Sequence, residues 1–257
     1  MEELKIPQLH YVTRGQGTAL MLVHGFPLNH TIWNETAALL EDEARVILPD
    51  LPGHGQSPVV EPVSMELMAD GLAAILDALG IEKVVLAGQS MGGYVCLAFA
   101  RRHPQRLAGL GLVCTQAAAD SPEKRQARLA QAEQTLAEGS QRVVESMSAV
   151  LTNRPEMAAG MRSLMSTTPA AGMAAALRAM AERAEMSAFL PQISVPALVM
   201  AGLADAIIPV ERAREMAASL PDAQLVELAG VGHSPMMEAP QVTAEALLGL
   251  LKRAQGE

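Results

Sequence analysis

The first part of the chain, up to residue 114, alternates short aliphatic runs with longer segments in which apolar residues recur at helical spacing. This alternation is typical of β-α-β units, whose strands form a parallel sheet that is buried on both faces. The same pattern returns near the C-terminus. Strands are predicted at residues 19–23, 45–49, 84–87, 107–114, 197–201 and 224–228, and helices at 33–40, 64–79, 91–102, 210–220 and 239–253.

The pattern changes between the predicted strands at 107–114 and 197–201. This stretch is rich in Ala, Met, Arg and Glu, and strand patterns are missing from it. Asp-Ser-Pro-Glu at 120–123 is typical of a helix start, because a capping side chain precedes a proline in the first turn. Glycine and proline residues then divide the segment into about four helices. We therefore predict an α/β core domain, residues 1–118 and 191–257, that is interrupted by a helical insertion at 119–190.

Composition and charge narrow the class of protein. Half of the 257 residues are hydrophobic, so a single α/β domain of this length can bury a core without disulfides or a metal. The 28 acidic and 19 basic residues give a net charge of −9, which opposes binding to nucleic acid or to an anionic membrane surface. Cys96 and Cys114 are isolated in apolar segments, without the spacing of a zinc site. We expect no metal and no nucleic-acid partner.

The N-terminal residues 1–7 lack the basic and apolar segments of a signal peptide. No run of 18 apolar residues occurs, so no membrane span is predicted. We therefore expect a cytoplasmic protein. The sequence leaves its oligomeric state open.

Gly-Gln-Ser-Met-Gly at residues 88–92 lies where a predicted buried strand turns directly into a helix. Gly-x-Ser-x-Gly at such a turn is typical of a nucleophilic serine, because strand and helix approach closely and leave room only for glycine at positions 88 and 92. The start of the helix also directs free N–H groups to this place. Ser90 is the predicted nucleophile, and Gly88 and Gly92 are structural residues of its turn. A chance glycine-rich loop is the alternative.

A serine hydroxyl needs a general base, and the base needs an acid that orients it. His233 and Asp205 each come after the carboxyl end of a predicted strand, at the edge where open α/β sheets bind their ligands. We predict a catalytic triad of Ser90, Asp205 and His233. Asp120, which opens a predicted helix, is the alternative acid.

The tetrahedral intermediate of such a reaction requires donors for its oxyanion. We predict one donor to be the backbone N–H of Met91, the residue after the nucleophile. His-Gly-Phe-Pro at 24–27 follows the first strong strand, and we predict the second donor to be the backbone N–H of Phe26. Gly25 is expected to shape this loop, and His24 to brace it by a hydrogen bond.

These segments together make the chain resemble an α/β-hydrolase-fold serine hydrolase. The resemblance covers nearly the whole sheet domain and is closest to small carboxylesterases and enol-lactonases. It implies a mostly parallel central sheet flanked by helices, with the insertion forming a helical cap over the active site. The matching segments are 24–27, Asp-Leu-Pro-Gly-His-Gly-Gln-Ser at 50–57, 88–93, Gly-Leu-Ala-Asp at 202–205 with Pro209, and Gly232 and His233 with Pro235, Glu238 and Pro240.

The identity of residue 90 separates the chain from some relatives. Haloalkane dehalogenases and epoxide hydrolases of this fold use an aspartate there, and dienelactone hydrolases use a cysteine. The resemblance therefore implies a carboxylesterase that cleaves small aliphatic esters through an acyl-enzyme, without a cofactor. An enol-lactonase or a cofactor-free perhydrolase with the same triad stays open. So does a protein of another class, a ligand-sensing signalling protein of this fold.

The insertion holds seven methionines, whereas one of the six aromatic residues, Phe189, lies in or near it. We therefore predict cap-side pocket walls that are aliphatic and methionine-lined. Arg162, Arg178 and Arg183 are expected to face solvent. If one of them points inward, it would bind a substrate carboxylate and favour the lactonase interpretation.

Overall fold

The computed structural model describes residues 6–256, and within them it forms a seven-stranded sheet in the order β1-β3-β2-β4-β5-β6-β7. Each neighbouring pair is parallel except β1 with β3, which is antiparallel. The mostly parallel α/β sheet predicted from the sequence is confirmed. The strands are Tyr11–Arg14 (β1), Ala19–Val23 (β2), Arg45–Pro49 (β3), Val84–Gln89 (β4), Leu107–Val113 (β5), Ala197–Gly202 (β6) and Ala223–Leu228 (β7).

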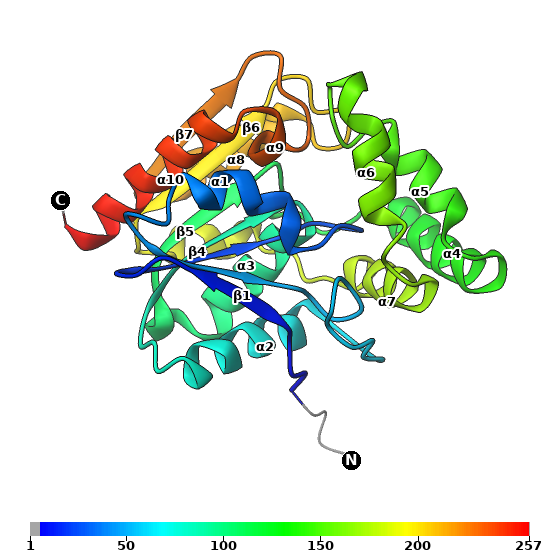
Figure 1. The fold of residues 1–257 in the computed structure, drawn as a ribbon, viewed down its shortest axis with the longest axis horizontal. Coiled ribbons are helices and arrows are strands. Elements are labelled where there is room, and N and C mark those ends of the chain that lie inside the picture. The colour runs from blue at the N-terminus through cyan, green and yellow to red at the C-terminus, as the bar shows by residue number, and fades with distance from the viewer. Residues whose placement is uncertain (1–5, 257) are drawn as a thin grey trace.

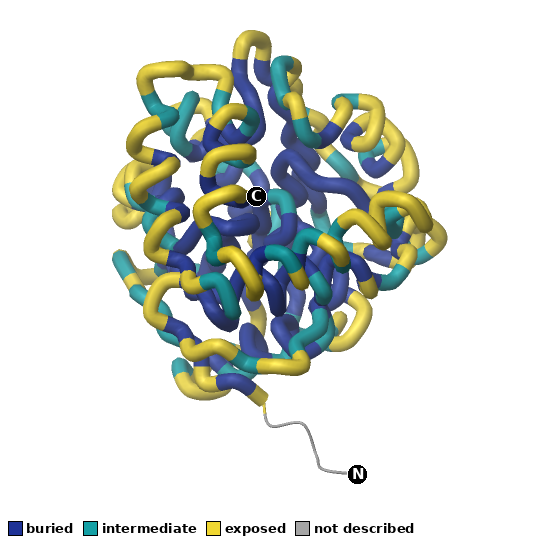
Figure 2. The backbone as a smooth tube through the Cα atoms, turned by 90° about the vertical axis from the view of Figure 1, so that its right-hand side faces the viewer, coloured by how far each residue is buried: buried dark blue, intermediate teal, exposed yellow. Residues whose placement is uncertain are grey.

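Helices cover both faces of the sheet (Figure 1). Helices α1 and α10 pack together on one face, and α2 packs against α3 on the other. Buried backbone fills the interior behind exposed helical turns (Figure 2). The α-helices are Asn34–Ala38 (α1), Met65–Ala78 (α2), Met91–Arg102 (α3), Pro122–Glu138 (α4), Gln141–Ser148 (α5), Ala158–Met165 (α6), Ala170–Ala181 (α7), Val210–Ser219 (α8), Pro235–Glu238 (α9) and Pro240–Gln255 (α10).

Local sequence explains where several of these elements begin. The Ser64 hydroxyl caps α2 by accepting from the Leu67 N–H at 3.1 Å. Ser121 caps α4 in the same way, and Pro122 occupies its first turn, where no N–H is needed. Strands β2, β4 and β6 are buried along their whole length, which explains their continuous apolar sequences.

Two of the differences from the predicted elements lie near the N-terminus. Strand β1 was not predicted, because Tyr11–Arg14 is a short, partly exposed edge strand without a clear apolar alternation. The predicted helix at 33–40 is a 3₁₀ turn, His30–Trp33, followed by the short helix α1. The Asn29 side chain caps this turn by accepting from the Thr31 N–H at 3.0 Å, so the helical segment starts earlier than the hydrophobic pattern indicates.

Helices α4 to α7 lie between β5 and β6 in sequence and gather beside the sheet (Figure 1, green). We call residues 119–190 the helical insertion. Helix α4 packs along α7, and Met161, Met165 and Met173 are fully buried. Hydrogen bonds join the insertion to loops of the core: Thr168 Oγ1 donates to the Pro27 carbonyl at 2.9 Å. This contact joins the insertion to the loop that follows β2.

Within residues 6–256, the helices are all too short or too polar to cross a lipid bilayer.

Candidate active site

Ser90 occupies a strained turn between β4 and α3. Its backbone angles are φ 53° and ψ −114°, outside the regions that residues other than glycine normally adopt. Backbone hydrogen bonds hold this conformation: the Ser90 N–H donates to the Val113 carbonyl at 2.9 Å, and the Ser90 carbonyl accepts from the Gly93 N–H at 2.9 Å. Thr115 Oγ1 donates to the same carbonyl at 2.7 Å. The turn therefore fixes the serine at the carboxyl end of β4.

Glycines allow the close approach that this turn requires. A Cβ atom at Gly88 would lie 2.3 Å from the Gly92 carbonyl carbon, and one at Gly92 would lie 2.5 Å from the Val23 carbonyl oxygen. A Cβ atom at Gly25 would lie 2.1 Å from Gln89 Oε1. A side chain at position 88 or 92 would push apart β2, β4 and α3, and one at position 25 would displace the Gln89 side chain.

His233 and Asp205 form a buried pair beside this turn. Nδ1 of His233 lies 2.7 Å from Oδ2 of Asp205, and both side chains are almost completely buried. The other Asp205 oxygen accepts from the backbone N–H groups of Ile207 and Ile208, at 2.8 and 3.1 Å. The carboxylate thereby holds the proton on Nδ1 and leaves Nε2 as the basic nitrogen.

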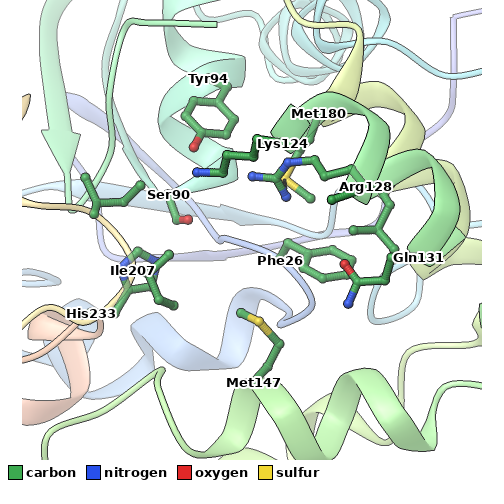
Figure 3. Close-up of a pocket in the computed structure, with 13 residues that line it drawn as sticks. Phe26, Ser90, Tyr94, Lys124, Arg128, Gln131, Met147, Met180, Ile207 and His233 are labelled. Carbon is green, nitrogen blue, oxygen red and sulfur yellow. Dashed lines mark hydrogen bonds between the residues drawn. The ribbon is translucent and has the colours of Figure 1, made fainter. Parts of the chain in front are cut away.

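Ser90 and His233 face one cavity of about 430 Å³ (Figure 3). No hydrogen bond joins the Ser90 hydroxyl to His233 in the described chain, but the two side chains border the same space. The core contributes Phe26, Ser90, Tyr94, Ile207, Ile208 and His233 to the lining, and the helical insertion contributes Lys124, Ala127, Arg128, Gln131, Met147, Leu177 and Met180.

The prediction of an aliphatic, methionine-lined wall on the insertion side of the cavity is only partly right. Met147, Leu177 and Met180 fit that prediction, but Lys124, Arg128 and Gln131 add a polar face. These three positions recur at i, i+4 and i+7, so they share one side of α4. The spacing was visible in the sequence, but which side of α4 faces the core depends on tertiary packing.

The prediction that Arg183 faces solvent is also wrong. The Arg183 side chain is 3% exposed, pairs with Asp120 at 2.9 Å, and lies 4.2 Å from the Tyr94 ring centre. Arg128 Nε donates to the other Asp120 oxygen at 2.6 Å. Asp120, the alternative triad acid, is therefore held by arginines, and it is Asp205 that contacts His233.

The other two arginines lie outside the cavity. Arg178 pairs with Glu133 at 2.8 Å and with Glu61 at the surface. Arg162 contacts the Ser148 hydroxyl at 3.5 Å. Neither lines the space around Ser90.

The loop after β2 approaches the Ser90 turn through His24 and Gly25. His24 Nδ1 donates to the Gly25 carbonyl at 3.0 Å, and Nε2 accepts from the Leu51 N–H at 2.9 Å. Burial lowers the pKa of His24 to about 3, so the imidazole is neutral and can play both roles. This arrangement places Phe26 at the cavity, and Met91 begins α3 directly after Ser90.

Glu238 holds the loop that carries His233. Its carboxylate accepts from the backbone N–H groups of Gly232 at 3.0 Å and Ser234 at 3.3 Å, and Gln89 Nε2 donates to the His233 carbonyl at 3.0 Å. Glu238 lies in one of the segments that resemble α/β hydrolases, but no role is predicted for it from the sequence. An acidic residue five positions after the histidine is the signal that could have indicated one.

Two groups of side chains in residues 6–256 bring possible metal ligands together: His10 with His30 and Asp50, and Cys114 with Asp205 and His233. In the first, both imidazoles contact the buried Asp50 carboxylate, at 2.9 and 2.8 Å. Burial raises the pKa of Asp50, but hydrogen bonds from His30 and Gln56 outweigh burial and hold it well below its usual value. Hydrogen bonding thus accounts for this cluster without an ion.

In the second group, burial raises the pKa of the Cys114 thiol well above its ordinary value. The thiol is therefore neutral, whereas metal binding requires a thiolate. Sγ lies 3.7 Å from the Gly232 carbonyl oxygen, to which it donates.

Among curated proteins, the chain is 31% identical over 248 residues to a pimeloyl-[acyl-carrier protein] methyl ester esterase from Chromobacterium violaceum, covering 91% of this chain and 94% of the esterase. It is 32% identical over 250 residues to the dihydrolipoyllysine-residue acetyltransferase component of an acetoin cleaving system from Pseudomonas putida. That match covers 92% of this chain but 64% of the acetyltransferase component, so the chain spans less than two thirds of that relative.

Solved structures give the same fold. A thermophilic esterase from Thermogutta terrifontis, solved with malate bound, has a TM-score of 0.93 and 42% identity over 96% of this chain and 93% of its own. The enol-lactonase from Burkholderia xenovorans LB400 has a TM-score of 0.87 and 27% identity, covering 95% of this chain and 96% of its own. The family model described as alpha/beta hydrolase fold matches residues 18–240. The chain therefore belongs to the α/β hydrolase fold family.

Proposed function

We propose that the protein is a serine carboxylic-ester hydrolase that acts through an acyl-enzyme. One observation carries this proposal: the His233 imidazole, oriented by Asp205 at 2.7 Å, borders the same cavity as Ser90. A hydroxyl, a base and an orienting acid at one cavity are the groups that acyl transfer by serine requires. The similarity to proteins named as esterases supports an ester as the substrate.

In the first half of the reaction, Ser90 Oγ attacks the acyl carbon while Nε2 of His233 accepts the hydroxyl proton. The carbonyl π electrons move to oxygen, giving a tetrahedral intermediate. When this collapses, the bond to the alcohol oxygen breaks, and His233 returns the proton to the leaving alcohol. The product of this half is an acyl ester of Ser90.

In the second half, water attacks the same acyl carbon and gives its proton to His233. Collapse of the second tetrahedral intermediate breaks the bond to Ser90 Oγ, and the proton returns to the serine. The carboxylic acid leaves, and the enzyme regains its starting form. Asp205 stabilises the imidazolium that forms in each half.

Backbone N–H groups of Met91 and Phe26 stabilise the oxyanion in both halves. Met91 begins α3, so its N–H has no partner within the helix. Phe26 lies on the loop after β2. Gly25 in this loop has no Cβ atom, so the loop can approach Gln89 closely. Donors that are fixed before the reaction strengthen their interaction as negative charge develops, which lowers the barrier.

Lactone hydrolysis is a second candidate, because a lactone is a cyclic ester and the same attack opens it. The similarity to the Burkholderia enol-lactonase favours this candidate. In both cases the helical insertion acts as the cap, since α4, α5 and α7 supply side chains to the cavity.

The test compares the wild-type protein with Ser90→Ala on 4-nitrophenyl acetate and butyrate. We expect multiple turnovers by the wild type and a loss of ~10³-fold or more in kcat for the variant. Ser219→Ala, which removes an exposed hydroxyl at the end of α8, serves as the control and should keep its activity. Wild-type rates in Ser90→Ala would disprove the proposal. Reaction that stops after one equivalent would instead indicate a ligand sensor.

A further inference from the structure

Two cations of α4 line the cavity that holds Ser90. Lys124 and Arg128 are one helical turn apart, so both side chains leave the same side of α4. Figure 3 shows their charged ends directed from α4 toward the side of the cavity that contains Ser90 and Tyr94. None of the described residues that line this cavity is Asp or Glu. The wall opposite the proposed nucleophile is therefore positively charged.

Asp120, behind this wall, balances only part of the charge. One of its oxygens accepts a hydrogen bond from Arg128 Nε at 2.6 Å, and the other lies 2.9 Å from Arg183 Nη1 as an ion pair. The Lys124 ammonium lies 3.8 Å away, beyond hydrogen-bond distance. Three cations thus surround one carboxylate, and the cluster carries two net positive charges.

Donors of both cations are free to bind a ligand. Arg128 Nη1 contacts the Met180 thioether at 3.5 Å, and sulfur is a weak acceptor. Among residues 6–256, Lys124 Nζ donates to no acceptor within hydrogen-bond distance. Burial lowers the pKa of Lys124, and the neighbouring Arg128 lowers it further. An anion in the cavity would relieve this repulsion.

Several other arginines of this acidic chain are paired with carboxylates at the surface. Arg106 pairs with Asp77 at 2.7 Å, and Arg214 with Glu227 at 2.7 Å. The chain carries 28 acidic residues, so partners for Lys124 and Arg128 are abundant in composition but missing from the cavity lining. Within the described chain, the cavity lining therefore has no carboxylate of its own to offset these two cations.

We propose that Lys124 and Arg128 bind an anionic group of the substrate, and that the enzyme prefers esters which carry a second, ionised group, such as a carboxylate. This inference rests on the proposed function and specifies its substrate class. A guanidinium can hold both oxygens of a carboxylate, and the ammonium adds a third donor. The second group thereby orients the ester carbonyl at Ser90.

The test measures kcat/KM for two pairs of esters by titration of the released acid. Monoethyl succinate is compared with ethyl succinamate, in which a neutral amide replaces the carboxylate of the acyl part. Acetoxyacetate is compared with 2-acetoxyacetamide, in which the change is in the alcohol part. We expect the anionic ester to be preferred by ~10-fold or more in at least one pair. The pair that shows the preference identifies which part of the ester faces α4.

Variants then connect the preference to the two cations. Lys124→Gln with Arg128→Gln should lower kcat/KM for the preferred anionic ester by ~10-fold or more, and change that for its amide by less than ~3-fold. Arg125→Gln is the matched control, since Arg125 lies on the same helix, is equally exposed at 45%, and pairs with Glu182 outside the cavity. If the double variant does not fold, Lys124→Gln alone is measured. We expect it to reduce the preference for the anionic ester by ~3-fold or more.

The outcomes separate this inference from the proposed function. Equal kcat/KM values within both pairs would overturn the inference. The proposed function would stay intact if the ester bond of the two amide-bearing esters were still cleaved in a Ser90-dependent reaction. A preference that survives in the double variant and in Lys124→Gln would also overturn it. Hydrolysis by Ser90→Ala would overturn the proposed function instead.

Discussion

The carboxylate of Glu238 accepts a hydrogen bond from the backbone N–H of Asn153 at 3.1 Å. Asn153 belongs to the helical insertion, and the same carboxylate oxygen accepts from Gly232 in the His233 loop. Asn153 also donates from its side chain to the Gly230 carbonyl at 3.1 Å. One carboxylate therefore links the loop of the proposed catalytic base to the helical insertion.

Replacing Glu238 should disturb the His233 loop and its contact with the helical insertion at once. Glu238→Ala leaves three backbone N–H groups without their acceptor, which we expect to cost ~1–3 kcal/mol of stability. Calorimetry should show the lower Tm, and kcat on 4-nitrophenyl butyrate should fall by ~10-fold as His233 loses its fixed position. Glu245→Ala, an exposed change on α10, should alter neither. Unchanged kcat in Glu238→Ala would show that the His233 loop holds its position without this carboxylate.

The acid of the triad can be identified by two matched substitutions. Asp205→Asn removes the charge that holds the Nδ1 proton of His233, and we expect kcat to fall by ~10²–10⁴-fold. Asp120→Asn affects the arginine cluster, so its rate on neutral esters should fall by less than ~10-fold. Both variants are measured with the same 4-nitrophenyl ester. The reverse order of effects would assign the acid to Asp120.

The Ser90 turn should tolerate no side chain at Gly92. Gly92→Ala places a Cβ atom 2.5 Å from the backbone oxygen of Val23, and we expect a loss of ~3 kcal/mol or more, or failure to fold. Gly249→Ala in α10 meets no atom within 4 Å and should stabilise the protein by up to ~1 kcal/mol. Urea unfolding measures both. A Gly92→Ala protein as stable as wild type would contradict the close packing of β2 on α3.

Acid should destabilise the protein because His24 and His54 are buried in their neutral forms. Burial lowers the pKa of His24 to about 3 and that of His54 to about 4, whereas the unfolded chain takes up these protons near the ordinary value of 6.5. Below pH 6.5 the unfolded state thus binds more protons than the folded state. The contribution of these histidines to the free energy of unfolding is therefore fully present above pH 6.5 and decreases as the pH falls toward 4.

The measurement is Tm from pH 7.5 to 4.5 for wild type and His54→Gln. We expect a smaller decrease of Tm with acidification in the variant, since one of the two imidazoles that must be kept neutral is gone. His103→Gln, which removes a partly exposed histidine paired with Asp70, is the control for a general effect of losing a histidine. Parallel curves for wild type and His54→Gln would contradict the prediction.

Much of the sheet and of its nucleophile turn could be predicted from local sequence. The strands at 19–23 and 45–49 and the helix at 91–102 were predicted with the bounds that β2, β3 and α3 have. Their signals are short-range: buried parallel strands are continuously apolar, and a helix that starts at Met91 follows from the glycines around Ser90. The backbone strain at Ser90, in contrast, is also held by residues distant in sequence, since its N–H donates to the Val113 carbonyl and its carbonyl accepts from Thr115 Oγ1.

Sequence by itself thus determined the α/β class, the position of Ser90, and the order in which Asp205 and His233 follow it. Tertiary structure decided which charges meet. The pairing of Asp120 with Arg183, the contact of Asp205 with His233, and the direction of Lys124 into the cavity each join segments that are distant in the chain. Helical periodicity shows which residues share a side of α4, but only the packing of α4 on α7 and the core selects the side that faces Ser90.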